Sequence, residues 1–114
     1  MAEFVTFRRW VIADSAQEDA VVALVRDAIV PAYHQLPACL KIGLLRIVGT
    51  NAYLATQHWH SRAAYEAALA APEYAQWRAA YEPALACWHA LMTLAEAWET
   101  EELLGAAGDL SSHE

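Results

Sequence analysis

Residues 41–60 read KIGLLRIVGTNAYLATQHWH, and this stretch decides the fold. Two runs rich in β-branched, aliphatic and aromatic residues, about 41–48 and 52–60, flank a Gly-Thr-Asn turn. Runs of this composition on either side of such a turn predict an antiparallel β-hairpin. Asn51 is expected to be the turn residue with left-handed backbone angles.

The segment before the hairpin predicts a strand and then a helix. Residues 4–13 are rich in aromatic and β-branched types, as strands are. Ser15, with Glu18 three residues later, indicates a capping box at the start of a helix. Apolar residues then recur every three or four positions through 16–35, which predicts an amphipathic helix. We expect Pro31 to kink this helix.

Two further helices are expected after the hairpin. Ser61 can cap a short helix over 62–70, and Pro72 suits the first position of a longer one. The longer helix carries an aromatic stripe at helical spacing, which comprises Tyr74, Trp77, Tyr81 and Trp88. Pro83 predicts a kink or a break in it, because proline disfavours helix at the preceding residue.

Residues 91–99 fit two structures. Met92, Leu94 and Trp98 alternate with other residues as in a strand, whereas Met92 also continues the helical stripe from Trp88. If the segment is a strand, the element order is β-α-β-β-α-β. We therefore expect a ferredoxin-like α+β fold with an antiparallel four-stranded sheet.

The length of 114 residues fits one domain, which we place at 1–104, followed by a flexible acidic tail at 105–114. The net charge of −7 belongs mostly to the end of the chain, because six acidic residues and no Lys or Arg follow residue 95. The remaining body, near −1, has no basic stripe, so a nucleic-acid partner is not expected.

Targeting and redox features indicate a cytoplasmic protein. An apolar run of about 18 residues is absent, so no membrane partner is expected. The first residues, MAEF, do not resemble a secretory signal. Cys39 and Cys87 are too few for a disulfide framework and are expected to be reduced thiols.

The second strand is apolar on both faces. Leu40, Ile42 and Leu44 are expected on one face, and Leu45 and Ile47 on the other. Helices can cover one face of the sheet, but the chain has no further layer for the other. A homodimer with sheet packed on sheet is the expected cover.

Three segments together resemble the dimeric α+β barrel superfamily and, within it, the antibiotic biosynthesis monooxygenase-like family. They are PACLKIGLLR at 37–46, NAYLATQHWHS at 51–61, and Tyr65 with PEY at 72–74. The resemblance spans about residues 4–99 and implies a dimeric α+β barrel. It also implies oxidation of phenolic or quinol substrates by O2 without metal or flavin, so no cofactor is expected.

The resemblance also bears on haem. Haem-degrading relatives place a ligating His in the helix after the position of Trp59. Residues 73–78 read EYAQWR here and contain no His, so the sequence does not favour haem binding.

Trp59, His58 and His60 are the candidate catalytic residues. Trp59 is either a core or cleft-wall residue or one whose indole N–H donates to a substrate oxygen. The resemblance implies that it lines the pocket between sheet and helices. Either His is a candidate acceptor of a substrate proton if it reaches the cavity. His58 and His60 at strand spacing can also share a metal, but a third ligand is missing nearby, so no metal site is expected.

The candidate substrate-binding residues combine aromatic rings with polar groups. They are Gln57, Tyr65, Tyr74, Trp77, Arg78 and Tyr81. Three polar-tipped aromatics in one helical stripe are unusual for a dry core, because each O–H or N–H needs a partner. Arg78 is either in an exposed ion pair with Glu82 or an anion anchor at the mouth of the cleft.

The expected function is a cofactor-independent monooxygenase that oxidises a small aromatic, phenol- or quinol-like substrate with O2. Two alternatives remain open from the sequence. One is a non-enzymatic small-ligand-binding or stress-associated dimer of the same fold. The other is an isomerase or decarboxylase of a small cyclic acid that would use the same His as its base.

Overall fold

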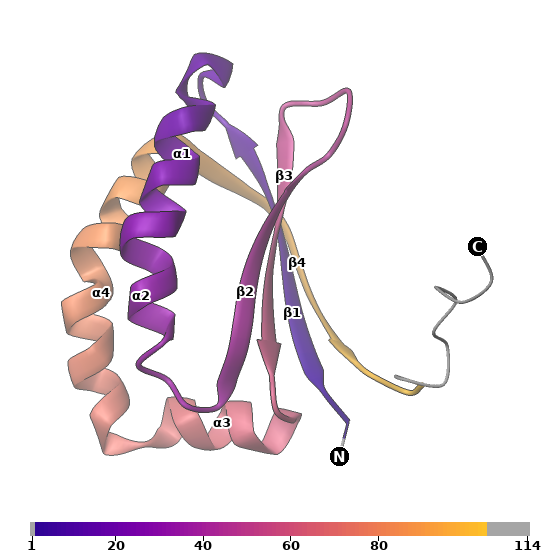
Figure 1. Ribbon diagram of the computed structural model, residues 1–114, viewed down its shortest axis with the longest axis vertical. Helices are drawn as coiled ribbons and strands as arrows, with labels where there is room; N and C mark the ends of the chain where they lie inside the picture. The colour runs from indigo at the N-terminus through magenta and orange to yellow at the C-terminus, as the bar shows by residue number, and fades with distance from the viewer. Residues whose placement is uncertain (1, 105–114) are drawn as a thin grey trace.

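The computed structural model describes residues 2–104 as four strands and a set of helices (Figure 1). In chain order the elements are β1 (Phe4–Ile12), a 3-10 turn (Ser15–Gln17), α1 (Glu18–Leu24), a π-helical turn (Val25–Ile29), α2 (Val30–Tyr33), β2 (Cys39–Arg46), β3 (Ala52–Trp59), α3 (Arg62–Ala70), α4 (Pro72–Leu91) and β4 (Met92–Glu101). The strands form one antiparallel sheet in the order β2-β3-β1-β4. The ferredoxin-like α+β fold is confirmed; the tail expected at 105–114 lies outside the described residues.

The predicted hairpin of β2 and β3 is confirmed, but its turn differs in one residue. Gly49 takes the positive φ, at 80°, and no other residue type does so within residues 2–104. The prediction for Asn51 is therefore wrong. The Thr50 hydroxyl donates to the Ile47 carbonyl over 2.7 Å and accepts from the Ala52 N–H over 3.0 Å. Thr50 closes the turn, and the left-handed backbone conformation is adopted by Gly49, which has no Cβ to oppose it.

The first helical run begins with a different cap from the expected one. Asp14, not Ser15, is the N-cap residue, and its carboxylate accepts from the Ala16 N–H over 3.0 Å. Glu18 does not fold back to complete a capping box. Its carboxylate receives two hydrogen bonds from Arg46, at 2.6 and 3.0 Å, and one from the Tyr53 hydroxyl. This tertiary ion pair ties the start of α1 to the sheet.

Both prolines inside helices leave the chain helical. A π-helical turn precedes Pro31, and the run continues through α2 to Tyr33. The helix α4 runs without a break through Pro83. A proline cannot donate to the carbonyl four residues earlier, here that of Ala79. Pro83 and Ala79 are both exposed, so water can satisfy that carbonyl.

The open choice for residues 91–99 resolves as a strand. Helix α4 ends at Leu91, and β4 begins at the next residue and pairs with β1 along its length. The ladder has one irregularity, opposite Arg9 and Trp10. Pairing with β1 gives the backbone N–H and C=O groups of β4 their hydrogen-bond partners. The spacing of residues within the segment does not reveal this pairing.

The helices α1, α2 and α4 all lie on one face of the sheet (Figure 1). The core lies between them and the sheet. One buried cluster comprises Trp10, Ile12, Val21, Ile29, Tyr53, Tyr81, Trp88 and Met92, and a second comprises Phe4, Leu36 and Trp59. Between residues 2 and 104, none of the helices has the length and apolar character to cross a membrane.

The other face of the sheet is left uncovered by these helices. Alternation along the paired strands places a set of apolar side chains there: Val5, Phe7, Val11, Leu45, Leu54 and Trp98. We call this set the open sheet face. Phe7 and Trp98 stack on it, with ring centroids 5.5 Å apart. The prediction that apolar residues occupy both faces of the sheet is thus confirmed.

Candidate active site

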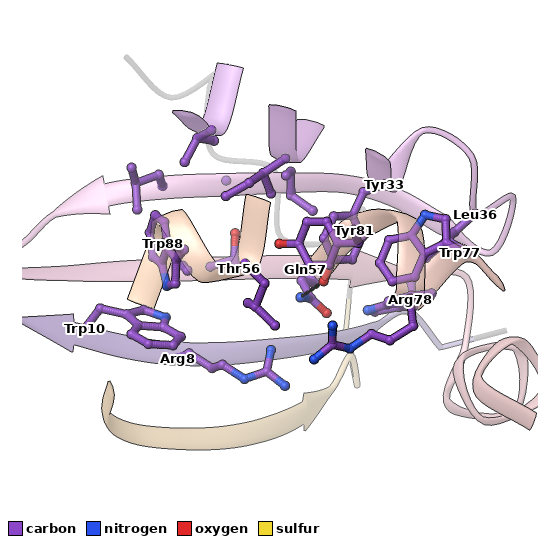
Figure 2. A pocket seen from close by; sticks show the side chains of 18 of the residues that line it. Arg8, Trp10, Tyr33, Leu36, Thr56, Gln57, Trp77, Arg78, Tyr81 and Trp88 are labelled. Atoms are coloured by element: carbon purple, nitrogen blue, oxygen red, sulfur yellow. Dashed lines mark hydrogen bonds between the residues drawn. The ribbon is translucent and has the colours of Figure 1, made fainter. Parts of the chain in front are cut away.

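A cavity of about 350 Å³ lies between the sheet and the helices. Its size is within the range of small-molecule sites, and aromatic rings from separate elements line it (Figure 2). The aromatic residues in its lining are Trp10, Tyr33, Trp59, Tyr65, Tyr74, Trp77, Tyr81 and Trp88. Strand residues on the helix-facing side supply the floor, including Arg8, Ile42, Leu44, Ala55 and Gln57.

One wall is a cluster of aromatic rings from α2 and α4. Trp77 stacks on Tyr81 with ring centroids 5.0 Å apart, and Tyr33 meets both rings edge to face. Tyr74 also stacks on Trp77, with ring centroids 5.6 Å apart. The Trp77 indole N–H donates to the Ala32 carbonyl over 2.8 Å, so this donor is used within the protein. The wall is a preformed surface for a planar ring.

A chain of hydrogen bonds crosses the floor of the cavity to this wall. The Thr6 hydroxyl donates to the Gln57 amide oxygen over 3.2 Å, and the Gln57 amide N–H donates to the Tyr33 hydroxyl over 3.0 Å. Burial raises the pKa of Tyr33 far above its usual range. Tyr33 therefore stays protonated at neutral pH and can donate its own O–H to a neighbour.

Trp59 provides an unpaired donor. The side chain is 1% exposed, and within the described part of the chain its indole Nε1 has no hydrogen-bond partner. Its ring meets Tyr65 edge to face, and Tyr65 in turn contacts Phe4. A buried donor without a partner costs about 1–3 kcal/mol. Trp59 is also one of the residues that line the cavity.

Two arginines, Arg8 and Arg78, line the cavity. Within the described part of the chain, the lining includes no Asp or Glu. Figure 2 shows Arg8 extending from β1 and Arg78 from α4 into the same part of the cavity. Arg78 donates to the Glu82 carboxylate over 2.6 Å, so the predicted ion pair is present. Arg78 is thus in the predicted ion pair and also in the cavity lining, and its role as an anion anchor stays a prediction.

The structure brings together most of the residues selected from the sequence. One set lines the cavity: Gln57, Trp59, Tyr65, Tyr74, Trp77, Arg78 and Tyr81. His58 does not, because neighbouring residues of a strand point to opposite faces. Its Nδ1 lies 2.6 Å from Glu3 Oε1 instead. His60 follows the end of β3 and is exposed. Residues 2–104 contain no group of three or more His, Cys, Asp or Glu side chains that could hold a metal ion.

Sequence reasoning missed several lining residues, among them Arg8, Tyr33 and His89. Tyr33 and His89 reach the cavity through helix packing, for which the sequence has no local signal. Arg8 did have one. It is a charged residue on the otherwise core-facing side of a strand of alternating pattern.

A family model described as antibiotic biosynthesis monooxygenase matches residues 5–80. The chain belongs to the antibiotic biosynthesis monooxygenase family. The matched range includes β1, the hairpin, α3 and the first part of α4, and so most of the residues around the cavity. No curated protein matches the chain.

Solved structures share the fold of this family member. HapK from Hahella chejuensis is 18% identical with a TM-score of 0.65, over 90% of this chain and 94% of HapK. SnoaB, described as a cofactor-independent oxygenase from Streptomyces nogalater, is 20% identical with a TM-score of 0.64, over 93% of this chain and 98% of SnoaB. A dimeric ferredoxin-like protein from an uncultured marine organism is 13% identical with a TM-score of 0.69, over 93% of this chain and all of that chain.

Proposed function

We propose that this protein is a cofactor-independent monooxygenase that oxidises a small aromatic phenol or quinol with O2 in the cavity of each subunit. The observation that carries the proposal is the cavity lined by aromatic rings, whose lining includes Trp59 with its buried, unpaired indole N–H. A flat aromatic substrate with an oxygen substituent matches both features. Membership of the monooxygenase family supports the same class of reaction.

The reaction needs only the substrate and O2. The phenol loses its O–H proton, and the phenolate transfers one electron to O2. The aryloxyl radical and superoxide then form a C–O bond at a ring carbon, and the peroxide takes up a proton. Loss of the ring C–H proton breaks the O–O bond and releases water, so that phenol and O2 yield quinone and water. A mostly dry pocket protects the reactive intermediates.

Hydrogen-bond donors in the cavity stabilise the phenolate. The Trp59 N–H and the Tyr33 O–H are the proposed donors to the substrate oxygen, where they are worth most as negative charge develops. Gln57 positions Tyr33 through the hydrogen bond to its hydroxyl. The rings of Tyr74, Trp77, Tyr81 and Tyr65 hold the substrate plane, and Arg78 adds positive charge.

We assign proton acceptance to His89 instead of His58 or His60. His89 lines the cavity, with its ring centroid 5.7 Å from that of Trp10. His58 pairs with Glu3 on the other face of the sheet, and His60 is outside the lining. An imidazole is the side chain best suited to accept a proton near neutral pH.

The open sheet face supports a homodimer as part of this proposal. Leu45 and Trp98 on that face are 58% and 39% exposed in the single chain. A second copy packed face to face would bury these side chains and the stacked Phe7. Stable interfaces bury about 800 Å² per partner, which a face of four short strands can supply.

Oxygen uptake with 1,5-dihydroxynaphthalene, which has a ring C–H para to a hydroxyl, tests the activity. We expect O2 consumption and quinone formation above the uncatalysed rate, with one atom of ¹⁸O from ¹⁸O2 in the quinone. The activity should persist after treatment with a metal chelator. A His89→Gln variant should lose most of the activity, and His34→Gln, an exposed imidazole outside the cavity lining, should retain it. An uptake no faster than without protein would contradict the proposal.

A non-enzymatic ligand-binding protein is the second candidate. It is favoured by the absence of any Asp or Glu from the cavity lining within the described residues. Saturable binding of the dihydroxynaphthalene, without O2 uptake above background, would identify this function instead.

A further inference from the structure

Arg8 occupies an unusual position on the central strand β1. The side of β1 that faces the helices carries Phe4, Thr6, Arg8, Trp10 and Ile12 in alternation. The other four side chains are buried, at 2–6% exposure. Arg8 alone is charged and only partly buried, and it opens onto the cavity. An arginine on the core side of a central strand costs stability unless something compensates its charge.

The protein itself does not compensate that charge. Among residues 2–104, Arg8 makes no side-chain hydrogen bond and no ion pair within 4.0 Å. On the helix-facing side of the sheet, the acid nearest to it in the register is Glu99, opposite Thr6 on β4. Glu99 is exposed and lies beyond ion-pair distance. The adjacent Arg9, on the other face, has its partner in Glu96 at 2.8 Å.

The charge of the cavity differs from that of the whole chain. The chain carries −7, yet the described lining has two arginines and no carboxylate. Arg78 shares its charge with Glu82, which leaves Arg8 as the unshared cation. A planar guanidinium binds a carboxylate or another oxyanion through two parallel N–H bonds, and partial burial strengthens them.

We propose that Arg8 binds an oxyanion carried by the aromatic substrate. This inference rests on the proposed function and narrows its substrate class from phenols and quinols in general to those that enter the cavity as anions. The anion is either a ring carboxylate or a second phenol group, apart from the one that Trp59 and Tyr33 bind, that is already ionised. Arg8 is thus a specificity-determining residue, distinct from the donors Trp59 and Tyr33.

Calorimetric titration with four naphthalene probes tests the inference on the full chain at pH 7. 2-Naphthoate carries a carboxylate, and its methyl ester keeps the shape without the charge. 2,4-Dinitro-1-naphtholate is an ionised phenol, and 2-naphthol is a neutral one. We expect at least one of the two anions to bind more tightly than its neutral counterpart, and the tighter of the two identifies the source of the oxyanion.

Arg8→Gln should weaken the binding of that anion about 10- to 100-fold, the loss expected for a charge-assisted hydrogen bond. It should leave the neutral probes unchanged, and Arg8→Lys should restore part of the loss. Arg62→Gln is the matched control, because it removes the same charge from an exposed site on α3 outside the lining. The thermal transition of each variant shows that it is folded.

Several outcomes would overturn the assignment. They are an unchanged affinity of Arg8→Gln for the anions, an equal weakening of anions and neutral probes, and an effect no larger than that of Arg62→Gln. If wild type binds neutral and anionic probes alike and oxidises the dihydroxynaphthalene, only the role of Arg8 fails. If wild type binds none of the probes, the cavity itself is not an aromatic-ligand site, and the proposed function fails as well.

Discussion

The indole ring of Trp59 meets the phenol ring of Tyr65 edge to face, with centroids 4.9 Å apart and planes at 74°. Trp59 ends β3, and the Ser61 hydroxyl accepts from the Ala64 N–H over 3.0 Å to begin α3. This cap orients α3 so that Tyr65 returns over Trp59. The short motif Trp-His-Ser therefore has a structural basis: one residue lines the cavity, and the next but one positions the helix beside it.

Trp59→Phe should reduce kcat/KM about tenfold or more while the protein stays folded. The variant removes the N–H proposed to stabilise the phenolate, and one lost donor to developing charge costs a factor of this order or larger. Its free energy of unfolding should change little, because the loss of buried area is offset by removal of an unpaired buried donor. Oxygen-uptake kinetics and urea denaturation measure the two effects, and an unchanged kcat/KM would count against a catalytic role.

Ser61→Ala should destabilise the fold by about 1 kcal/mol, because it removes the N-cap hydrogen bond of α3. Ser15→Ala is the matched control. Ser15 was the expected cap of the first helix, but Asp14 has that role, so the control should change stability by less. Urea denaturation compares the two variants. Equal effects would show that the Ser61 cap has no special importance.

Gln57→Leu should lower the free energy of unfolding by about 1–3 kcal/mol. It leaves the buried Thr6 hydroxyl without its acceptor and Tyr33 without its donor. Tyr33→Phe removes the other end of the chain, so the two substitutions combined should cost less than their sum. A double-mutant cycle by urea denaturation measures this coupling. Strict additivity would show that the bonds contribute independently.

The protein should sediment as a dimer of its 12.6 kDa subunit at micromolar concentration. Leu54→Glu places a charge on the open sheet face and should yield monomers with a lower thermal midpoint, because buried unpaired charges are costly. Val48→Glu, at a 90% exposed position near the hairpin turn, should remain a dimer. Equilibrium sedimentation distinguishes the two. A well-folded wild-type monomer would refute the dimer.

The stability contributed by Glu18 should depend on pH. Hydrogen bonds from Arg46 and then from Tyr53 lower the pKa of Glu18 below its ordinary value of 4.5. A carboxyl with a lowered folded-state pKa stabilises the fold above its unfolded-state pKa, and this contribution is lost as the pH falls through the folded-state value.

The thermal midpoint of Glu18→Gln should therefore lie below that of wild type at pH 6–7, and the difference should shrink as the pH falls below 4.5. Asp19→Asn, an exposed neighbour on α1, is the control for the loss of one charge. A difference between Glu18→Gln and wild type that stays constant from pH 7 to pH 3 would contradict the role of the carboxylate.

Local signals in the sequence determined the order of elements as far as α4 and the part of one cavity wall that α4 supplies. The hairpin, the cap at Ser61 and the stripe of Tyr74, Trp77 and Tyr81 depend on residues close together in the chain. The spacing of these residues is enough to predict which side chains lie on the same face of a helix or strand. The resemblance added the position of Trp59 beside the helices.

Tertiary structure decided everything that depends on a distant partner. Residues 92–101 became a strand because β1 offers an unpaired edge, and Glu18 left its expected cap because Arg46 lies within reach. His89 rather than His58 lines the cavity because β3 turns one imidazole away and the packing of α4 brings the other near. Contacts between segments far apart in the chain produce no periodic pattern of residues in the sequence. Such hydrogen bonds, ion pairs and shared faces can therefore be seen only in the folded molecule.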